Sequence, residues 1–314
     1  MVSRRVLRSK IFQSLYAYFQ SESDNINKFE NELKLSIDRL QDLYIYLLLF
    51  PLELVHIAEI KMEEAKNKRL PTAEDLNPKR HFVDNKILKI FQENSNLLKL
   101  AKDKHISWSN ESELLYKAFN FFRNHPKFEA FKSIEEPSFE DDRNFIISFY
   151  KHIFSNYELL ISHLQDKSIY WEYDDIDFIL NTIIKNLKTI KKDSFYNVPE
   201  LYKDEDDKKF VTELFRNTIK LNEENQKLIA KYAKNWEVDR IALTDRLLMS
   251  MAITEFLTLK TIPVKVSLNE YIELAKWYST PKSKVFVNGI LDKIVVELKE
   301  KDKIKKSGRG LVEN

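Results

Sequence analysis

Hydrophobic residues recur at helical spacing along most of the chain, and this pattern predicts an all-α protein. In residues 1–20, apolar side chains return every three or four positions, and Ser3 is placed to cap the helix (Leu7, Ile11, Leu15, Tyr18 and Phe19 form the apolar face). Residues 239–260 are apolar almost all round. A helix with so little polar surface is normally buried at the centre of a domain.

Two further helices are predicted after this buried one. The segment Thr261-Ile262-Pro263 ends the buried helix, because proline disfavours the helical conformation of the residue before it. Ser267 and Glu270 have the spacing of a capping box, which predicts that the next helix begins at Ser267. The last helix is expected to open at Thr280-Pro281, since proline is tolerated in the first turn.

The long middle segment, residues 21–203, also reads as helical and folded. Proline-containing breaks separate its apolar stretches, and aromatic residues are plentiful. The helices predicted there cover residues 27–50, continuing after Pro51 to 68, then 84–104, 110–124, 139–165 and 171–192. We interpret this segment as a large helical insertion that extends the scaffold or a partner surface.

Two amphipathic helices, residues 208–220 and 222–235, precede the buried helix, and the run from Asp204 to Asp207 suits the start of the first. The end of the chain carries six basic residues between Lys299 and Arg309 and two of the three glycines. The sequence therefore predicts four parts: residues 1–20, a first helix; 21–203, the insertion; 204–298, a helical core; and 299–314, a basic flexible tail.

Composition narrows the function. The chain has 314 residues, no cysteine and a formal charge of +2, which excludes disulfides, a cysteine nucleophile and thiolate zinc sites. Its longest apolar run, Leu43 to Phe50, is far shorter than the roughly 20 residues that a membrane span needs. We therefore expect a soluble cytoplasmic protein without a membrane segment.

Enzymatic signatures are missing from the sequence. The six histidines are scattered through residues 56–163 without metal-binding spacing, and three glycines are too few for a phosphate-binding loop. We expect no catalytic residues, no metal and no cofactor.

The first helix carries four basic residues, Arg4, Arg5, Arg8 and Lys10, and residues 1–20 contain no acidic one. The three arginines project together near the helix start, where the macrodipole disfavours cations. Arginine suits phosphates and base edges because its guanidinium is planar and donates in pairs. The segment is therefore either a solvated basic face or a surface that meets an external anion.

The start of the last helix offers a second candidate site. Lys282 and Lys284 lie in its first turn, where they either bind phosphate together with backbone N–H groups or simply stay solvated. Phe286 is either a core residue or a ring that stacks on a base. Gly289 lies inside a helix at a cost of about 1 kcal/mol relative to alanine, which indicates close helix packing or the close approach of a partner.

Several of these pieces, in this order, resemble the NusB family of transcription antitermination factors. Both ends of the chain carry the resemblance, in the following segments: Arg4-Arg5-Val6-Leu7-Arg8 through Gln13-Ser14-Leu15-Tyr16, Glu255, Ile262 to Val266, Asn269-Glu270, Ile272 to Lys276, and Phe286 to Lys293. The family is usually far shorter and has another arginine where Val6 stands here. The resemblance implies an all-α, NusB-like helical bundle without catalytic activity, enlarged by the insertion.

The resemblance also implies partners and site residues. It implies binding of a boxA-type leader RNA together with the ribosomal protein NusE, within an RNA polymerase antitermination complex that promotes ribosomal RNA transcription. The RNA-binding residues would be Arg4, Arg5, Arg8, Lys10, Lys282, Lys284, Phe286 and Asn288. Tyr16, Asp239 and Asp245 would face NusE, although Asp239 has an equal reading as a helix cap.

Two alternative functions stay open. The first is a helical protein–protein adaptor that has lost RNA binding, since one arginine is missing and the insertion is large. Less favoured is a docking subunit for ribosomal RNA modification, because the methyltransferases that carry such a domain need a catalytic cysteine and a glycine-rich motif. The sequence does not give the oligomeric state.

Overall fold

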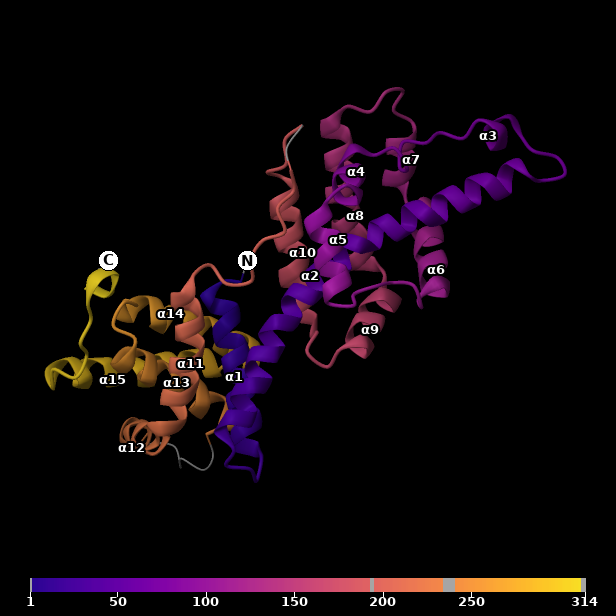
Figure 1. Cartoon of the computed structure of the whole chain (residues 1–314). Coiled ribbons are helices and arrows are strands. Elements are labelled where there is room, and N and C mark those ends of the chain that lie inside the picture. Colours follow the sequence, from indigo (N-terminus) through magenta and orange to yellow (C-terminus); the bar gives the residue numbers. More distant parts are fainter. Residues whose placement is uncertain (1, 193–194, 234–240, 312–314) are drawn as a thin grey trace. The chain divides into compact units, whose positions relative to one another are not determined.

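The computed structural model describes residues 2–192, 195–233 and 241–311, and within these ranges it contains helices and no strand (Figure 1). This confirms the all-α prediction. The helices are α1 (Arg4–Gln20), α2 (Ile26–Lys66), α3 (Ala73–Leu76), α4 (Lys86–Gln92), α5 (Ser95–Asp103), α6 (Ser112–Arg123), α7 (Pro126–Lys132), α8 (Phe139–Asn156), α9 (Glu158–Lys167), α10 (Tyr173–Leu187), α11 (Glu205–Lys220), α12 (Asn222–Tyr232), α13 (Leu243–Thr258), α14 (Val264–Tyr278) and α15 (Ser283–Glu300), followed by a 3-10 turn, η2 (Gly308–Leu311).

The chain folds into two compact units. Unit 1 comprises residues 1–37 and 202–314, and unit 2 comprises residues 38–201. The boundary falls inside α2, whereas the sequence placed a boundary after residue 20. The first turns of α2 belong to unit 1 because they bind its other helices: Arg216 on α11 donates from Nε to Glu30 at 2.5 Å, and Ser14 on α1 donates to the Phe29 carbonyl at 3.0 Å.

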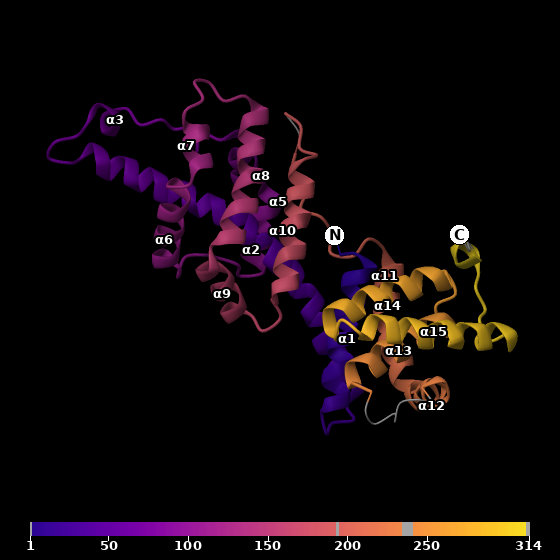
Figure 2. The ribbon, with the colours of Figure 1, turned by 180° about the vertical axis from the view of Figure 1, so that it is seen from behind.

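Unit 1 is built around α13. This helix packs against α1, α11, α12, α14 and α15, and Figures 1 and 2 both show it enclosed by them. Its side chains are buried on every side, including Leu248, Met249 and Ile253. The apolar composition of residues 239–260 therefore predicted the central helix, although α13 begins only at Leu243 and residues 239–240 lie outside the described part of the chain.

The starts of the next two helices differ from the prediction. Helix α14 begins at Val264, directly after Pro263, and not at Ser267. Ser267 is fully buried inside α14 and donates its hydroxyl to Glu255 Oε1 at 2.6 Å, so it does not form a capping box with Glu270. Helix α15 begins at Ser283, two residues after Pro281, and has no side-chain cap.

In unit 2 the sequence predicted a helix over residues 27–50 that continues after Pro51 to 68, and α2 runs through this proline without a break. A proline inside a helix removes its own N–H, which orphans the carbonyl four residues earlier. That carbonyl belongs to Leu47, and it accepts the buried Tyr150 hydroxyl of α8 at 3.0 Å. The neighbouring Tyr46 carbonyl accepts the Trp108 indole N–H at 2.9 Å. Tertiary hydrogen bonds therefore compensate the proline.

Helix α2 is long and apolar enough to cross a membrane by length and composition. Within unit 2, however, Leu43, Leu47 and Leu48 are completely buried, and 67% of its most apolar window is covered by the protein. Burial of this kind is typical of the core helix of a folded domain.

Two of the helices predicted in this region are each divided in the structure. Residues 84–104 form α4 and α5, because Asn94 turns the chain and accepts the Leu97 N–H at 2.9 Å as the cap of α5. Residues 139–165 form α8 and α9, with Tyr157 at the break. Polar and aromatic residues mark these breaks, not the prolines on which the prediction relied.

The end of the chain is not the flexible tail that the sequence predicted, as far as residue 311. Lys306 donates from Nζ to the carbonyls of Leu259, at 2.9 Å, and Glu255, at 3.2 Å, which end α13. A cation suits the C-terminus of a helix. Gly310 lies very close to the backbone of Lys260, just after α13. A Cβ at this position would lie 2.0 Å from the Lys260 carbonyl oxygen, so only glycine fits.

Tyr150→Phe should destabilise the protein by about 1–3 kcal/mol, because it leaves the Leu47 carbonyl buried without a donor. Chemical unfolding followed by circular dichroism would measure this change in the free energy of unfolding. Tyr157→Phe is the matched control, since the Tyr157 hydroxyl is buried without a hydrogen-bond partner in the described part of the chain. Equal effects of the two substitutions would contradict the role given to Tyr150.

Lys306 should make stability depend on pH. Burial lowers the pKa of Lys306 from 10.5 to about 8, so the unfolded chain binds more protons than the folded one between those values. Stability should therefore rise with pH across this window relative to Lys306→Met. Thermal unfolding of both proteins from pH 7.5 to 10.5 checks this, and parallel profiles would contradict it.

Candidate nucleic-acid interface

The basic start of α1 contains a buried ion pair. Arg8 is 2% exposed and donates from Nε and Nη2 to the carboxylate of Glu255 on α13, at 2.9 and 2.6 Å. Burial lowers the pKa of Arg8, but the charge of Glu255 and its hydrogen bonds outweigh burial and raise that pKa above its usual value. Arg8 therefore stays charged inside the core.

Two hydroxyl groups and an aromatic ring also contact this ion pair. Glu255 is completely buried and also accepts the hydroxyls of Ser267, at 2.6 Å, and Tyr271, at 2.9 Å, both on α14. The Arg8 guanidinium lies 5.2 Å from the ring centroid of Phe210 on α11, within cation–π distance. The network thus joins α1, α11, α13 and α14.

The other two arginines are also paired within the protein. Arg4 donates from Nε to Asp207 of α11 at 2.8 Å, and this carboxylate is nearly buried. Arg5 makes a bidentate pair with Glu270 of α14, with both distances 2.8 Å, and hydrogen bonds from Arg5 lower the pKa of Glu270. These carboxylates could not be assigned as partners from the sequence, because they lie 203 and 265 positions away from their arginines.

An exposed surface remains where α1, α14 and α15 meet. Arg5 is about half exposed, with 53% of its side chain accessible, despite its pair with Glu270. The pKa of Glu273 is lowered mainly by a hydrogen bond from Lys276, and the nearby charges of Arg5 and Lys284 lower it further. The structure therefore brings together cations from three helices, which we call the α1–α14–α15 surface (Arg5, Lys276, Lys284 and the adjoining Trp277).

Trp277 was missed by the sequence analysis. It follows Lys276 at the end of α14 and is 69% exposed, whereas its neighbour Tyr278 packs on Phe12 with ring centroids 4.5 Å apart. An exposed tryptophan beside a lysine is the combination that stacks on unpaired bases and holds their phosphates. The signal in the sequence was the pair Lys276-Trp277, but periodicity alone does not say which of two adjacent aromatic residues faces the solvent.

The remaining predicted RNA-binding residues lie in different environments. Lys10 is buried, whereas Lys282 and Lys284 are exposed at the start of α15. Phe286 is partly exposed, so it is not a core ring. Asn288 donates to Asp292 on the same helix at 3.0 Å.

Gly289 lies on the exposed side of α15, and a Cβ built there would meet nothing within 4 Å. Close helix packing, one of the two readings drawn from the sequence, is therefore wrong. The remaining reading is the close approach of a partner. Val285, one turn earlier on the same helix, is also well exposed at 73%.

The residues predicted to face a protein partner differ in their exposure to solvent. Tyr16 on α1 is exposed, with only Gln20 donating to its hydroxyl, at 3.3 Å, among the described residues. Asp239 lies outside the described residues. Asp245 is buried and accepts the Ser283 hydroxyl at 2.8 Å, which ties the first turn of α13 to the start of α15.

Comparison with known proteins identifies a family for part of the chain. Residues 185–296, which include α14 and most of α15 but not α1, match the NusB family model. The chain is 50% identical over 103 residues to a protein of Salinibacter ruber named "Transcription antitermination protein NusB", which covers 33% of this chain and 64% of that protein. The protein of the same name from Chloroherpeton thalassium is 49% identical over 106 residues, covering 34% of this chain and 50% of that protein.

A third relative of the same name, from Thermodesulfovibrio yellowstonii, is 40% identical over 92 residues, which is 29% of this chain and 61% of that protein. The chain thus spans between half and two thirds of the length of these relatives. A solved structure, "T. maritima NusB", has 28% identity, covers 46% of this chain and 89% of that chain, and has a TM-score of 0.30.

Arg8→Ala should destabilise the protein by about 3–5 kcal/mol, because it leaves the Glu255 carboxylate buried without its counter-charge. Arg8→Lys should cost less, since it keeps the charge but loses the bidentate geometry. Arg5→Ala is the control and should cost about 0–1 kcal/mol, as expected for an exposed pair. Denaturant unfolding measures all three. Arg8→Ala and Arg5→Ala with similar stability would contradict the central role of the buried pair.

Proposed function

We propose, from the NusB family domain that residues 185–296 form, that the protein is a non-catalytic, RNA-binding transcription antitermination factor of the cytoplasm. Its ligand would be a boxA-type leader RNA, bound together with NusE in an RNA polymerase antitermination complex that promotes ribosomal RNA transcription. The observation that carries the proposal is the 50% identity to a NusB antitermination protein, together with the exposed cations and tryptophan on α1, α14 and α15.

The α1–α14–α15 surface supplies the chemistry that such an RNA needs. Arg5 and Lys284 are positioned for phosphates, and Trp277 offers a ring on which an unpaired base stacks. Lys282 and Phe286 extend this surface along α15, where Gly289 leaves the backbone open to a close partner.

Three of the predicted RNA contacts need a different assignment. We assign Arg8 a structural role, because its guanidinium is buried and bound to Glu255. Lys10 is buried as well, and Arg4 is largely engaged by Asp207. Asn288 remains a contact only if it exchanges its hydrogen bond with Asp292 for one to RNA.

For the protein partner we retain Tyr16, which is exposed on α1. Asp245 fits a different role, because its carboxylate positions Ser283 at the start of α15. An effect of Asp245 on NusE binding would then be transmitted through the position of that helix.

The alternative function is a protein–protein adaptor that has lost RNA binding. The observation in its favour is that Arg4, Arg5 and Arg8 are each paired with a carboxylate of the same unit. Such pairs reduce the positive charge that an RNA would meet.

Fluorescence anisotropy of a labelled boxA RNA, titrated with the full chain, tests the proposal. Arg5→Gln/Lys284→Gln should weaken binding by about tenfold or more. It should also reduce the slope of log K against log salt by roughly 0.7 for each phosphate that the protein no longer neutralises. Trp277→Ala should cost about 1–3 kcal/mol of binding free energy if one base stacks there.

The matched control is Lys220→Gln/Lys227→Gln, which removes two positive charges from α11 and α12 of the same unit, away from the α1–α14–α15 surface as defined above. NusE should tighten RNA binding by the unaltered protein, and Tyr16→Ala should abolish that gain while leaving binding of RNA alone unchanged. No binding of boxA RNA by the folded protein, with or without NusE, would refute the RNA function and favour the adaptor.

A further inference from the structure

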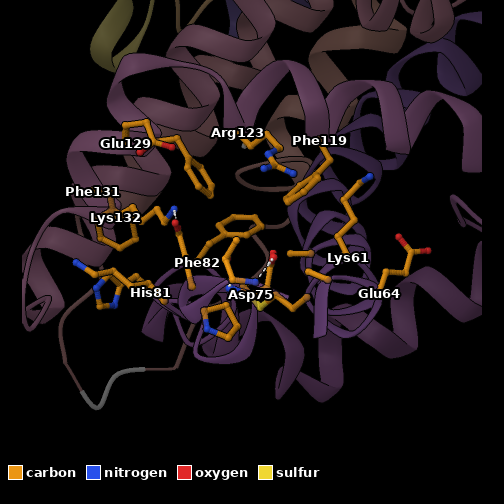
Figure 3. Close-up of a pocket in the computed structure, with 18 of the residues that line it drawn as sticks. Lys61, Glu64, Asp75, His81, Phe82, Phe119, Arg123, Glu129, Phe131 and Lys132 are labelled. Carbon is orange, nitrogen blue, oxygen red and sulfur yellow. Dashed lines mark hydrogen bonds and ion pairs between the residues drawn. The ribbon is translucent and has the colours of Figure 1, made fainter. Parts of the chain in front are cut away.

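Unit 2 contains a cavity of about 680 Å³ (Figure 3). It is lined by the last turns of α2, the segment that carries α3, and helices α6 and α7. The volume lies within the range of about 300–1,000 Å³ that is typical of small-molecule sites. Its lining residues fall between Ala58 and Lys132, outside the stretch that matches the NusB family.

The cavity has a wall of aromatic rings that are fixed from behind. Phe82, Phe119 and Phe128 line it, with the Phe82 ring centroid 6.3 Å from Phe119 and 5.9 Å from Phe128. Phe131 also lines it and stacks at 4.0 Å on Phe145, a ring of the core. Because the rings are held by one another and by the core, they offer a preformed surface for a flat aromatic ligand.

Two ion pairs fix the segment around α3. Lys68, two residues after the end of α2, lies 2.9 Å from Asp75, and Lys132 on α7 is paired with Glu74. The Thr72 backbone N–H donates to Asp75, and this hydrogen bond, with those from Lys68 and the Thr72 hydroxyl, lowers the pKa of Asp75 to about 2. This edge of the cavity is thus held in place, and its charges are neutralised within the protein.

A small excess of positive charge remains after these pairs are formed. Three cations and two carboxylates of the lining make no ion pair within the described part of the chain (Lys61, Lys79 and Arg123; Glu64 and Glu129). Figure 3 shows Arg123 extending beside the ring of Phe119, whereas the carboxylate of Glu64 points away from the rings. Arg123 and Lys79 are both exposed at the edge of the cavity, and the planar guanidinium of Arg123 can donate two hydrogen bonds to one phosphate.

We propose that this cavity binds a nucleotide, with the base against the rings of Phe82, Phe119 and Phe128 and the phosphate bound by Arg123 and Lys79. An inorganic anion would leave the aromatic wall unused, and a neutral apolar ligand would leave the two cations unused. A nucleotide satisfies both features. Free mononucleotides and single nucleotides of an unpaired nucleic-acid strand share this chemistry. The proposal is independent of RNA binding by unit 1.

Isothermal titration calorimetry of the full chain with AMP, GMP, CMP and UMP tests the site. At least one mononucleotide should bind saturably, and Lys79→Gln/Arg123→Gln should weaken that binding at least tenfold. The matched control, Lys99→Gln/Lys102→Gln, removes two exposed charges from α5 of the same unit and should leave the affinity unchanged. Circular dichroism establishes that each variant is folded.

The two halves of the ligand are tested separately. The nucleoside without its phosphate should bind at least tenfold more weakly than the mononucleotide, and inorganic phosphate should compete at least tenfold less well. A single-stranded pentanucleotide that binds more tightly than the mononucleotide identifies a nucleic-acid strand as the source, and one that does not bind identifies the free nucleotide. Absence of saturable nucleotide binding by the folded protein, equally weakened binding in the variant and its control, or phosphate competing as well as the nucleotide would overturn the proposal.

Discussion

The buried pair between Arg8 and Glu255 is the interaction on which unit 1 depends. A charged carboxylate inside the most apolar helix of the protein is unfavourable unless a cation and hydrogen-bond donors meet it. Arg8, Ser267 and Tyr271 supply them from α1 and α14. Arg8 of the first helix is therefore bonded to a residue that lies 247 positions later, and the unit closes only when both ends of the chain have come together.

This pair, together with two others, shows that the arginines of the first helix have carboxylate partners within the protein. The sequence shows three arginines without a nearby acid, which suggests an external anion, but Asp207, Glu255 and Glu270 provide internal ones. For the RNA binding that we propose, a smaller set of cations is available, mainly Arg5 and Lys284, together with the exposed ring of Trp277. The affinity for RNA would then depend on a few contacts of mixed type, because a dense arginine cluster is not available.

Local pattern was enough to predict the helical class, the central helix α13 and the Ser3 cap of α1, whose hydroxyl accepts the Val6 N–H at 3.5 Å. It failed where distant residues decide the outcome. Ser267 has the spacing of a cap but donates its hydroxyl to Glu255. The carbonyl that Pro51 frees inside α2, that of Leu47, accepts the hydroxyl of Tyr150, which lies 103 positions later. The same limit applies to the candidate site. Exposure of Trp277 and burial of Lys10 follow from packing, which periodicity describes only approximately.

The main feature of unit 2 is a preformed cavity lined by aromatic rings. The rings of Phe82, Phe119 and Phe128 line this cavity between the end of α2, the segment that carries α3, and helices α6 and α7. Ion pairs at Asp75 and Glu74 hold its edge, so the space does not depend on a ligand to stay open. A preformed space of this kind loses little free energy to ordering when a ligand enters, which is the property that a binding site needs.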